Sequence, residues 1–183
     1  MKNFYIILIL FFSFAIFSCA KKSDTSSTNT EIEGTWQTPC YVSGSYYYIK
    51  KVTVSGTNWT DTIESHTDSS CATEYDLWLR TFGSLSISGA QFTMTLSENT
   101  YTPQTSGGVS WSNTNSYCGL TGWEINTAQS AAGKTCGGTA INASGTAYYG
   151  LYLLDGSKLF WTLSSDAYND SVPTGDNDTF TKQ

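Results

Sequence analysis

The feature that most limits the fold of this chain is an alternation of apolar and polar residues over short segments. The segment Gln91–Glu98 shows it best, because Phe92, Met94 and Leu96 alternate with threonine and serine. A period of two residues places successive side chains on opposite faces of a β-strand. The same pattern predicts further strands at Ser45–Ser55, Trp59–His66, Tyr75–Phe82, Thr121–Thr127, Thr146–Leu154, Lys158–Leu163 and Asp178–Lys182.

The segments between these strands carry turn signals. Asp155-Gly156 is a strong hairpin signal, and the Ser/Gly/Asn-rich stretch Gln104–Tyr117 is expected to be a loop or a short helix. An aromatic content of 15% with only three prolines favours strands over helices. About eight short strands with at most one short helix predict an all-β fold, an antiparallel barrel or sandwich. A closed barrel suits a long meander because it leaves no exposed edge strand.

The strands follow a leader of a different character. Lys2 precedes an apolar run, Phe4–Phe17, which is shorter than the roughly 20 residues of a permanent membrane-spanning helix. Such a run is typical of the central region of a signal peptide. It ends in Ile16-Phe17-Ser18-Cys19, which resembles a lipobox. We therefore expect residues 1–18 to be a lipoprotein signal peptide and Cys19 to carry lipid. The alternative is an ordinary signal peptide cut near Ala20.

Residues 19–30 are rich in Ser, Thr, Lys and Asp and contain no large apolar residue. Such a segment cannot bury enough surface to offset its ordering entropy, so we expect a flexible tether. Acyl chains on Cys19 would then hold the domain to a membrane. Asp is absent from the position after Cys19, which favours the outer membrane in enteric bacteria. The expected location is therefore the cell envelope, periplasmic or surface-exposed.

The cysteine count fits an exported protein. The chain has five cysteines, and lipid on Cys19 leaves Cys40, Cys71, Cys118 and Cys136. An even number in an oxidising compartment indicates two disulfides, for which three connectivities exist. Sequential pairing, Cys40 with Cys71 and Cys118 with Cys136, is the favoured one. A zinc site is disfavoured because the sequence has no CxxC motif and a single histidine.

Several short motifs together resemble a known family. Glu33 is followed by Gly34-Thr35-Trp36, a Gly-x-Trp at the entrance to the first expected strand. This resembles the lipocalin and wider calycin families, and more closely a group of small bacterial lipoproteins with a lipocalin-like domain. The supporting motifs are GTWQTPC, DSSC, YCGLTGW, YYGLYLLDGSKLFW and the terminal FTKQ.

The resemblance implies an up-and-down barrel over residues 31–183 that encloses an apolar cavity. It also implies that Trp36 closes one end of the barrel. Lipocalins usually place an arginine of the last strand on this tryptophan, whereas the last strand here offers Lys182. The resemblance implies no particular substrate, because barrels of this kind host many functions.

The sequence marks no catalytic residues, no metal site and no cofactor site. No GxSxG motif points to a serine nucleophile, so we expect a protein that is not an enzyme, with the single histidine, His66, at the surface near a strand end. The acidic loop Ser164–Asp178 is expected to be a solvated turn rather than a calcium site. Isolated carboxylates are likewise expected to be solvated rather than paired for acid/base catalysis, namely Glu64, Glu74, Asp76 and Glu124.

Aromatic side chains are the best candidates for a binding surface, with core packing as the alternative. The candidates for lining a cavity are Trp36, Tyr46, Tyr48, Trp59, Trp78, Trp123, Tyr152 and Trp161. They favour a lipid-anchored barrel that binds a small apolar ligand. The alternative is a surface interaction or inhibitor module that binds an envelope or host protein through Gln104–Tyr117 and Ala128–Ser144. A net charge of −6 with Arg80 as the one arginine argues against nucleic acid.

Overall fold

The computed structural model describes residues 31–168 and 179–183. The expected signal peptide, Cys19 and the tether lie outside the described residues, as does most of the acidic loop Ser164–Asp178. Within the described part, no helix is both long and apolar enough to cross a membrane. The elements in chain order are β1 (Gly34–Gln37), β2 (Tyr41–Ser43), β3 (Tyr46–Ser55), β4 (Asn58–His66), β5 (Glu74–Ser88), β6 (Gln91–Pro103), α2 (Ser106–Thr114), η1 (Tyr117–Gly119), β7 (Gln129–Ser130), β8 (Thr135–Cys136), β9 (Thr139–Ala140), β10 (Ala147–Asp155), β11 (Lys158–Ser164) and β12 (Phe180–Lys182).

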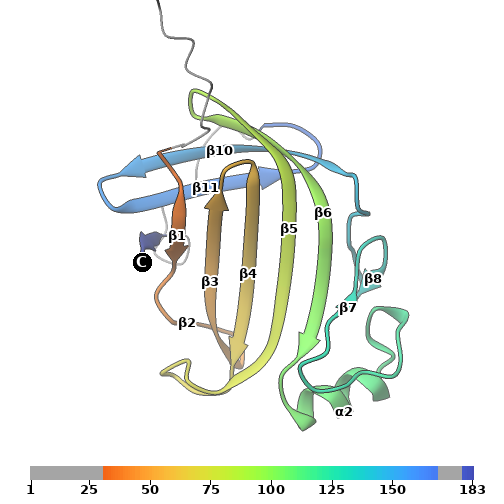
Figure 1. Ribbon diagram of the computed structural model, residues 1–183. Helices are drawn as coiled ribbons and strands as arrows, with labels where there is room; N and C mark the ends of the chain where they lie inside the picture. Colours follow the sequence, from red (N-terminus) through yellow and green to blue (C-terminus); the bar gives the residue numbers. More distant parts are fainter. Residues whose placement is uncertain (1–30, 169–178) are drawn as a thin grey trace, which may run out of the picture.

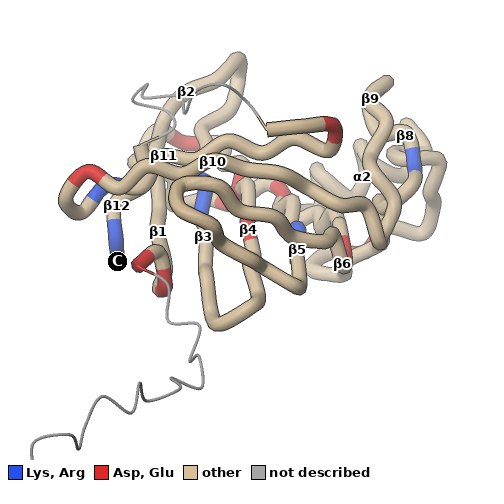
Figure 2. Tube along the Cα trace, turned by 90° about the horizontal axis from the view of Figure 1, so that it is seen from above, with Lys and Arg blue, Asp and Glu red and all other residues tan. Residues whose placement is uncertain are grey.

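Eight of these strands close into an antiparallel barrel. The ring runs β1-β12-β11-β10-β6-β5-β4-β3 and closes because β1 pairs with β12 on one edge and with β3 on the other. Figure 1 shows β3, β4, β5 and β6 side by side with β10 and β11 running across them. Figure 2 shows the same strands curling round from above. The predicted all-β barrel, with one short helix in the described part, is therefore confirmed.

A dense core fills one half of the barrel interior. Val54 of β3 pairs with Trp59 of β4, Trp59 pairs with Phe82 of β5, and Phe82 pairs with Leu96 of β6. All four side chains are buried, and burial of side chains of this size stabilises a fold by about 1.5–3 kcal/mol each. The predicted alternation in Gln91–Glu98 is confirmed, because its apolar residues are all buried in this core.

Trp36 packs in the same core cluster. Its side chain is buried, and its indole N–H donates a hydrogen bond to the carbonyl of Ile32 at 2.8 Å. Lys182 of β12 is its partner in register, with the ammonium 5.2 Å from the centroid of the indole ring. A cation over an aromatic face contributes about 0.5–1 kcal/mol at an exposed site. Lys182 therefore makes the contact that the family resemblance assigns to an arginine.

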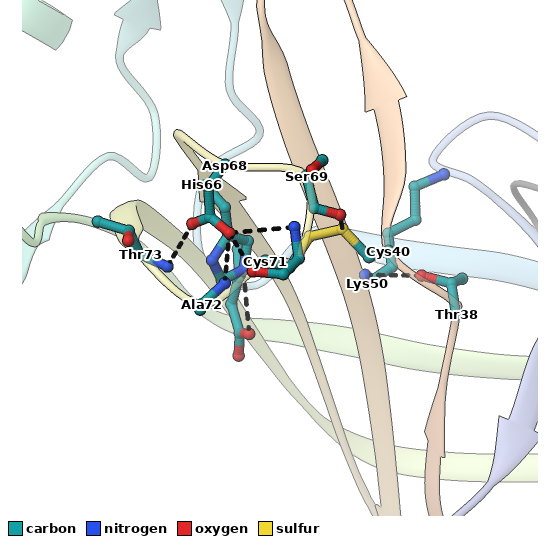
Figure 3. The surroundings of a disulfide bond; sticks show 11 residues. Thr38, Cys40, Lys50, His66, Asp68, Ser69, Cys71, Ala72 and Thr73 are labelled. Atoms are coloured by element: carbon teal, nitrogen blue, oxygen red, sulfur yellow. Dashed lines mark hydrogen bonds and ion pairs between the residues drawn. A yellow bond between two sulfur atoms is a disulfide. The ribbon is translucent and has the colours of Figure 1, made fainter.

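Two disulfides fix the loops, in the favoured sequential pairing. Cys40 is bonded to Cys71, and Cys118 is bonded to Cys136. On the chain-entropy model, loops of this size gain about 3–4 kcal/mol each. Figure 3 shows the first bond, which joins the segment before β2 to the β4–β5 loop. In that loop the Asp68 carboxylate accepts hydrogen bonds from Ser70, Ala72 and Thr73, and these bonds lower the pKa of Asp68.

The strand predicted at Thr121–Thr127 is wrong. For Gln104–Tyr117 the alternative of a short helix is confirmed, as α2. The side chain of Asn113 in that helix makes the hydrogen bonds to the Trp123 backbone that a neighbouring strand would otherwise make. The amide N–H of Trp123 donates to Asn113 Oδ1 at 2.9 Å, and the Trp123 carbonyl accepts from Asn113 Nδ2 at 3.0 Å. Because a side-chain amide satisfies both backbone groups, this irregular segment holds Trp123 buried while Ile125 stays exposed. Alternation alone does not distinguish this arrangement from a strand.

A glycine in β10 provides a test of the packed half. A Cβ built on Gly150 would lie 2.1 Å from Cζ of Phe92, whereas one on Gly83 of β5 would lie 3.6 Å from Ser97 Oγ. We expect Gly150→Ala to lower the free energy of unfolding by at least about 1–3 kcal/mol, as overpacking does. Urea denaturation measures it, with Gly83→Ala as the matched control. Equal stability of the two variants would contradict this packing.

Candidate ligand-binding groove

A row of polar side chains lines the half of the barrel that the core leaves open. Val52 of β3 pairs with Asp61 of β4, Asp61 pairs with Arg80 of β5, and Arg80 pairs with Asn99 of β6. This row lies two residues along each of β3, β4 and β5 from the packed row, so it points to the same, inner face. The barrel therefore carries a charged pair on its inside.

Asp61 and Arg80 form a bidentate ion pair. Arg80 Nε donates to Asp61 Oδ1, and Arg80 Nη2 donates to Asp61 Oδ2, both at 2.8 Å. The Asp61 side chain is 6% exposed and that of Arg80 is 28% exposed. Burial raises the pKa of Asp61, and the charge and hydrogen bonds of Arg80 oppose that rise. For Arg80, burial lowers the pKa but the Asp61 carboxylate outweighs it, so the guanidinium stays charged.

Two adjoining hollows lie over this ion pair. The first has a volume of about 170 Å³, and Lys50, Trp161 and Phe180 are among the residues that line it. The second has a volume of about 270 Å³, and its lining includes Trp78, Asn99 and Ile141. Because Asp61, Ile63 and Arg80 line both, we call the two hollows together the barrel groove. Together they provide room for one small molecule.

Three buried polar atoms of the groove lack hydrogen-bond partners within the described residues. They are the side-chain oxygen of Asn99, the indole N–H of Trp161 and the hydroxyl of Thr62. Asn99 is 5% exposed. Buried polar groups in folded proteins almost always have a partner, and leaving one without costs about 1–3 kcal/mol. The groove therefore presents an acceptor on Asn99, a donor on Trp161 and the hydroxyl of Thr62, next to apolar walls, to whatever it binds.

The aromatic candidates divide between core and cavity. Trp78 and Trp161 line the barrel groove, and Tyr46 lines a separate hollow beyond it. Tyr48 packs on Tyr41, with the ring centroids 5.9 Å apart. The remaining candidates are buried, and they are Trp36, Trp59, Trp123 and Tyr152. Of these, Tyr152 also lines a further hollow of about 260 Å³.

The polar candidates need correction at three places. Glu64 was expected to be solvated and unpaired, but its side chain is 13% exposed and its Oε1 accepts from Lys51 Nζ at 2.6 Å. His66 was expected at the surface but is 2% exposed at the end of β4, with Nε2 3.8 Å from Glu64 Oε2. Asp76 was expected to be solvated, but it is largely buried and accepts a hydrogen bond from Tyr101 at 3.0 Å and another from Ser65. His66 and Asp76 lie near the loop that joins β4 to β5. The face of β5 that carries Asp76, which was expected to meet solvent, points into the barrel. Glu74 and Glu124 are exposed as expected.

The Asp61–Arg80 pair is the feature that sequence reasoning missed. A signal for it exists, because Asp76, Trp78 and Arg80 share one face of Tyr75–Phe82. The opposite face carries Tyr75, Leu77 and Leu79, which are more apolar and would be placed inside by hydropathy alone. The barrel instead places the face with the charges inside, as the pairing of Asp61 with Arg80 requires.

Comparison with known proteins adds no family to this geometry: no family model matches the chain, and no curated protein matches it closely.

Removing one partner of the buried ion pair tests its energetic role. We expect Arg80→Ala to lower the free energy of unfolding by about 3 kcal/mol or more, because it leaves the buried Asp61 carboxylate without a counter-charge. The double variant with Asp61→Ala is expected to cost less than the sum of the two single changes. Lys51→Ala is the control, since it removes an ion pair with Glu64 in which Lys51 is 36% exposed, and such a pair is worth about 1 kcal/mol or less. A cost for Arg80→Ala no larger than for Lys51→Ala would contradict this role.

Proposed function

We propose that this protein is a lipid-anchored binding protein of the cell envelope, whose barrel groove holds a small, largely apolar molecule with one polar group. An eight-stranded antiparallel barrel fits a lipocalin-like scaffold. The observation that carries the proposal is the buried Asn99 side-chain oxygen, which lies in the groove without a partner among the described residues. A ligand that donates a hydrogen bond to it would recover the cost of its burial.

The lining of the groove supports this class of ligand. Ile63, Trp78, Trp161 and Ile141 supply apolar surface, which favours the transfer of apolar groups from water by about 25 cal/mol per Å² buried. Ile63 is 36% exposed, so the groove is open to an incoming molecule at this point. Polar atoms at the floor would orient the ligand, as in most small-molecule sites.

The anchoring half of the proposal rests on the leader. The apolar run Phe4–Phe17 ends directly before Ser18-Cys19, and a polar tether follows. Two disulfides in the barrel domain fit an oxidising compartment outside the cytoplasm. Lipid on Cys19 would place the groove within reach of molecules that partition into the membrane surface.

A fluorescent fatty alcohol tests the binding half, because its hydroxyl can donate a hydrogen bond to the Asn99 oxygen. We expect the probe to bind the purified full chain, and Ile63→Ala to weaken the affinity about tenfold, since each buried methylene contributes about 0.8 kcal/mol. Ile125→Ala is the matched control, because Ile125 is 49% exposed and lines neither hollow of the groove. Fluorescence titration gives the dissociation constants. If the probe binds both variants equally well, the groove is not its site.

Metabolic labelling tests the anchoring half. We expect labelled palmitate to enter the protein in a bacterial host, and Cys19→Ala to abolish the label because it removes the only thiol at the cleavage point. Ser18→Ala is the control, since a small residue remains before the cysteine. Equal labelling of the Cys19→Ala protein would refute lipidation at this residue.

A further inference from the structure

A third hollow lies beyond the groove, and aromatic rings form most of its lining. Its volume is about 250 Å³, and its lining is Tyr46, Tyr75, Asp76, Tyr101, Trp111 and Tyr117. These residues come from β3, β5, β6, α2 and η1. None of them lines the barrel groove, so an inference about this hollow stands independently of the function proposed above. We call it the aromatic cage.

The rings of the cage form two connected groups. On one side, Tyr46 and Tyr75 have ring centroids 5.1 Å apart. On the other, Tyr117 lies 4.8 Å from Tyr101 and 5.1 Å from Trp111, both in edge-to-face geometry. The face of an aromatic ring carries negative electrostatic potential, so a hollow bounded by several rings attracts cations.

Asp76 places a carboxyl group in the same hollow, and burial raises the pKa of this group while hydrogen bonds from Ser65 and Tyr101 oppose that rise. Its carboxylate accepts hydrogen bonds from the hydroxyls of Ser65 and Tyr101, and within the described residues it makes no ion pair. The Tyr101 hydroxyl lies 3.0 Å from Asp76 Oδ2, and Tyr117 lines the same hollow; burial, and after it the charge of Asp76, raises the pKa of both tyrosines. A buried carboxylate without a counter-charge is costly, and a bound cation would remove that cost.

The ligand atoms that the cage offers decide which kind of cation it can bind. Hard metal ions such as calcium take six to eight oxygen ligands, whereas the described residues hold no group of three or more His, Cys, Asp and Glu side chains suited to a metal. A primary ammonium group needs several hydrogen-bond acceptors, and two hydroxyls already occupy part of the Asp76 carboxylate. A quaternary ammonium group needs none, because its methyl groups pack on ring faces while its charge is neutralised by the rings and the carboxylate.

We propose that the aromatic cage binds a quaternary ammonium group of the choline type, held by the faces of Tyr46, Tyr75, Tyr117 and Trp111 and by the charge of Asp76. Trp111 belongs to α2 and is 47% exposed, so it lies on the solvent side of the cage, where the ligand would enter. The disulfide between Cys118 and Cys136 holds η1 and with it Tyr117.

Choline and its neutral isostere test the charge requirement. Titrations of the purified full chain with choline chloride and with 3,3-dimethylbutan-1-ol are followed by tryptophan fluorescence and isothermal calorimetry. We expect choline to bind at least about tenfold more tightly than the alcohol, because the two differ only in the charge that the cage is built to meet. Equal affinities, or no binding of choline at millimolar concentration, would overturn the proposal.

Two variants and a control locate the site. Trp111→Ala, at an exposed position, is expected to weaken choline binding by about 3- to 30-fold, the range for cation–π contacts, and Trp111→Phe is expected to restore much of it. Asp76→Asn is expected to weaken choline while leaving binding of the alcohol unchanged. Leu153→Ala is expected to change neither. Choline affinity that survives Trp111→Ala would overturn the proposal, even if Asp76→Asn fails to fold. Loss of choline binding with the fatty-alcohol titration of the groove intact separates this site from the groove.

Discussion

Closure of the barrel by β1 is the constraint on which the rest of the structure depends. This strand has four residues, yet it pairs with β3 on one edge and with β12 on the other. Closure removes the edges that an open sheet would expose to other chains. It also turns Trp36 inward, where Ile32 and Lys182 hold the indole in place. The core around Trp36 and Val52 includes Phe180, with Trp161 packed against it, and these two residues also line the first hollow, so the groove adjoins the core.

The boundary between core and groove explains why a charged pair lies inside the barrel. Where core residues fill the interior, the residues paired across neighbouring strands are apolar, as are Val54, Trp59 and Phe82. Two residues further along the same strands, Asp61 and Arg80 take the place of these apolar residues, at the point where the barrel begins to open. A buried ion pair is weak evidence for stability, because desolvation offsets the attraction of the charges. Its presence is better explained by the polar floor that it gives to the groove.

The barrel groove and the aromatic cage differ in charge. The groove has the Arg80 guanidinium at its floor and apolar walls. The cage has the Asp76 carboxylate and five aromatic rings. Trp78 lies between them, since it lines the groove and its ring is 5.2 Å from that of Tyr101. The segments around α2 and η1 build the outer wall of the cage, and the Cys118–Cys136 disulfide keeps them in place.

The sequence by itself determined most of the long strands, the Asp155-Gly156 hairpin and the all-β class, whereas the cysteine count left three disulfide pairings open. The strands and the hairpin follow from local alternation and turn chemistry, which short segments carry. Only the tertiary structure decided that Asp61, Arg80 and Asp76 face inward, that Asn113 rather than a strand holds Trp123, and which aromatics line hollows. The physical reason is that alternation separates two faces of a strand without saying which is inside. Closure of the barrel makes that choice, through pairings between residues far apart in the chain.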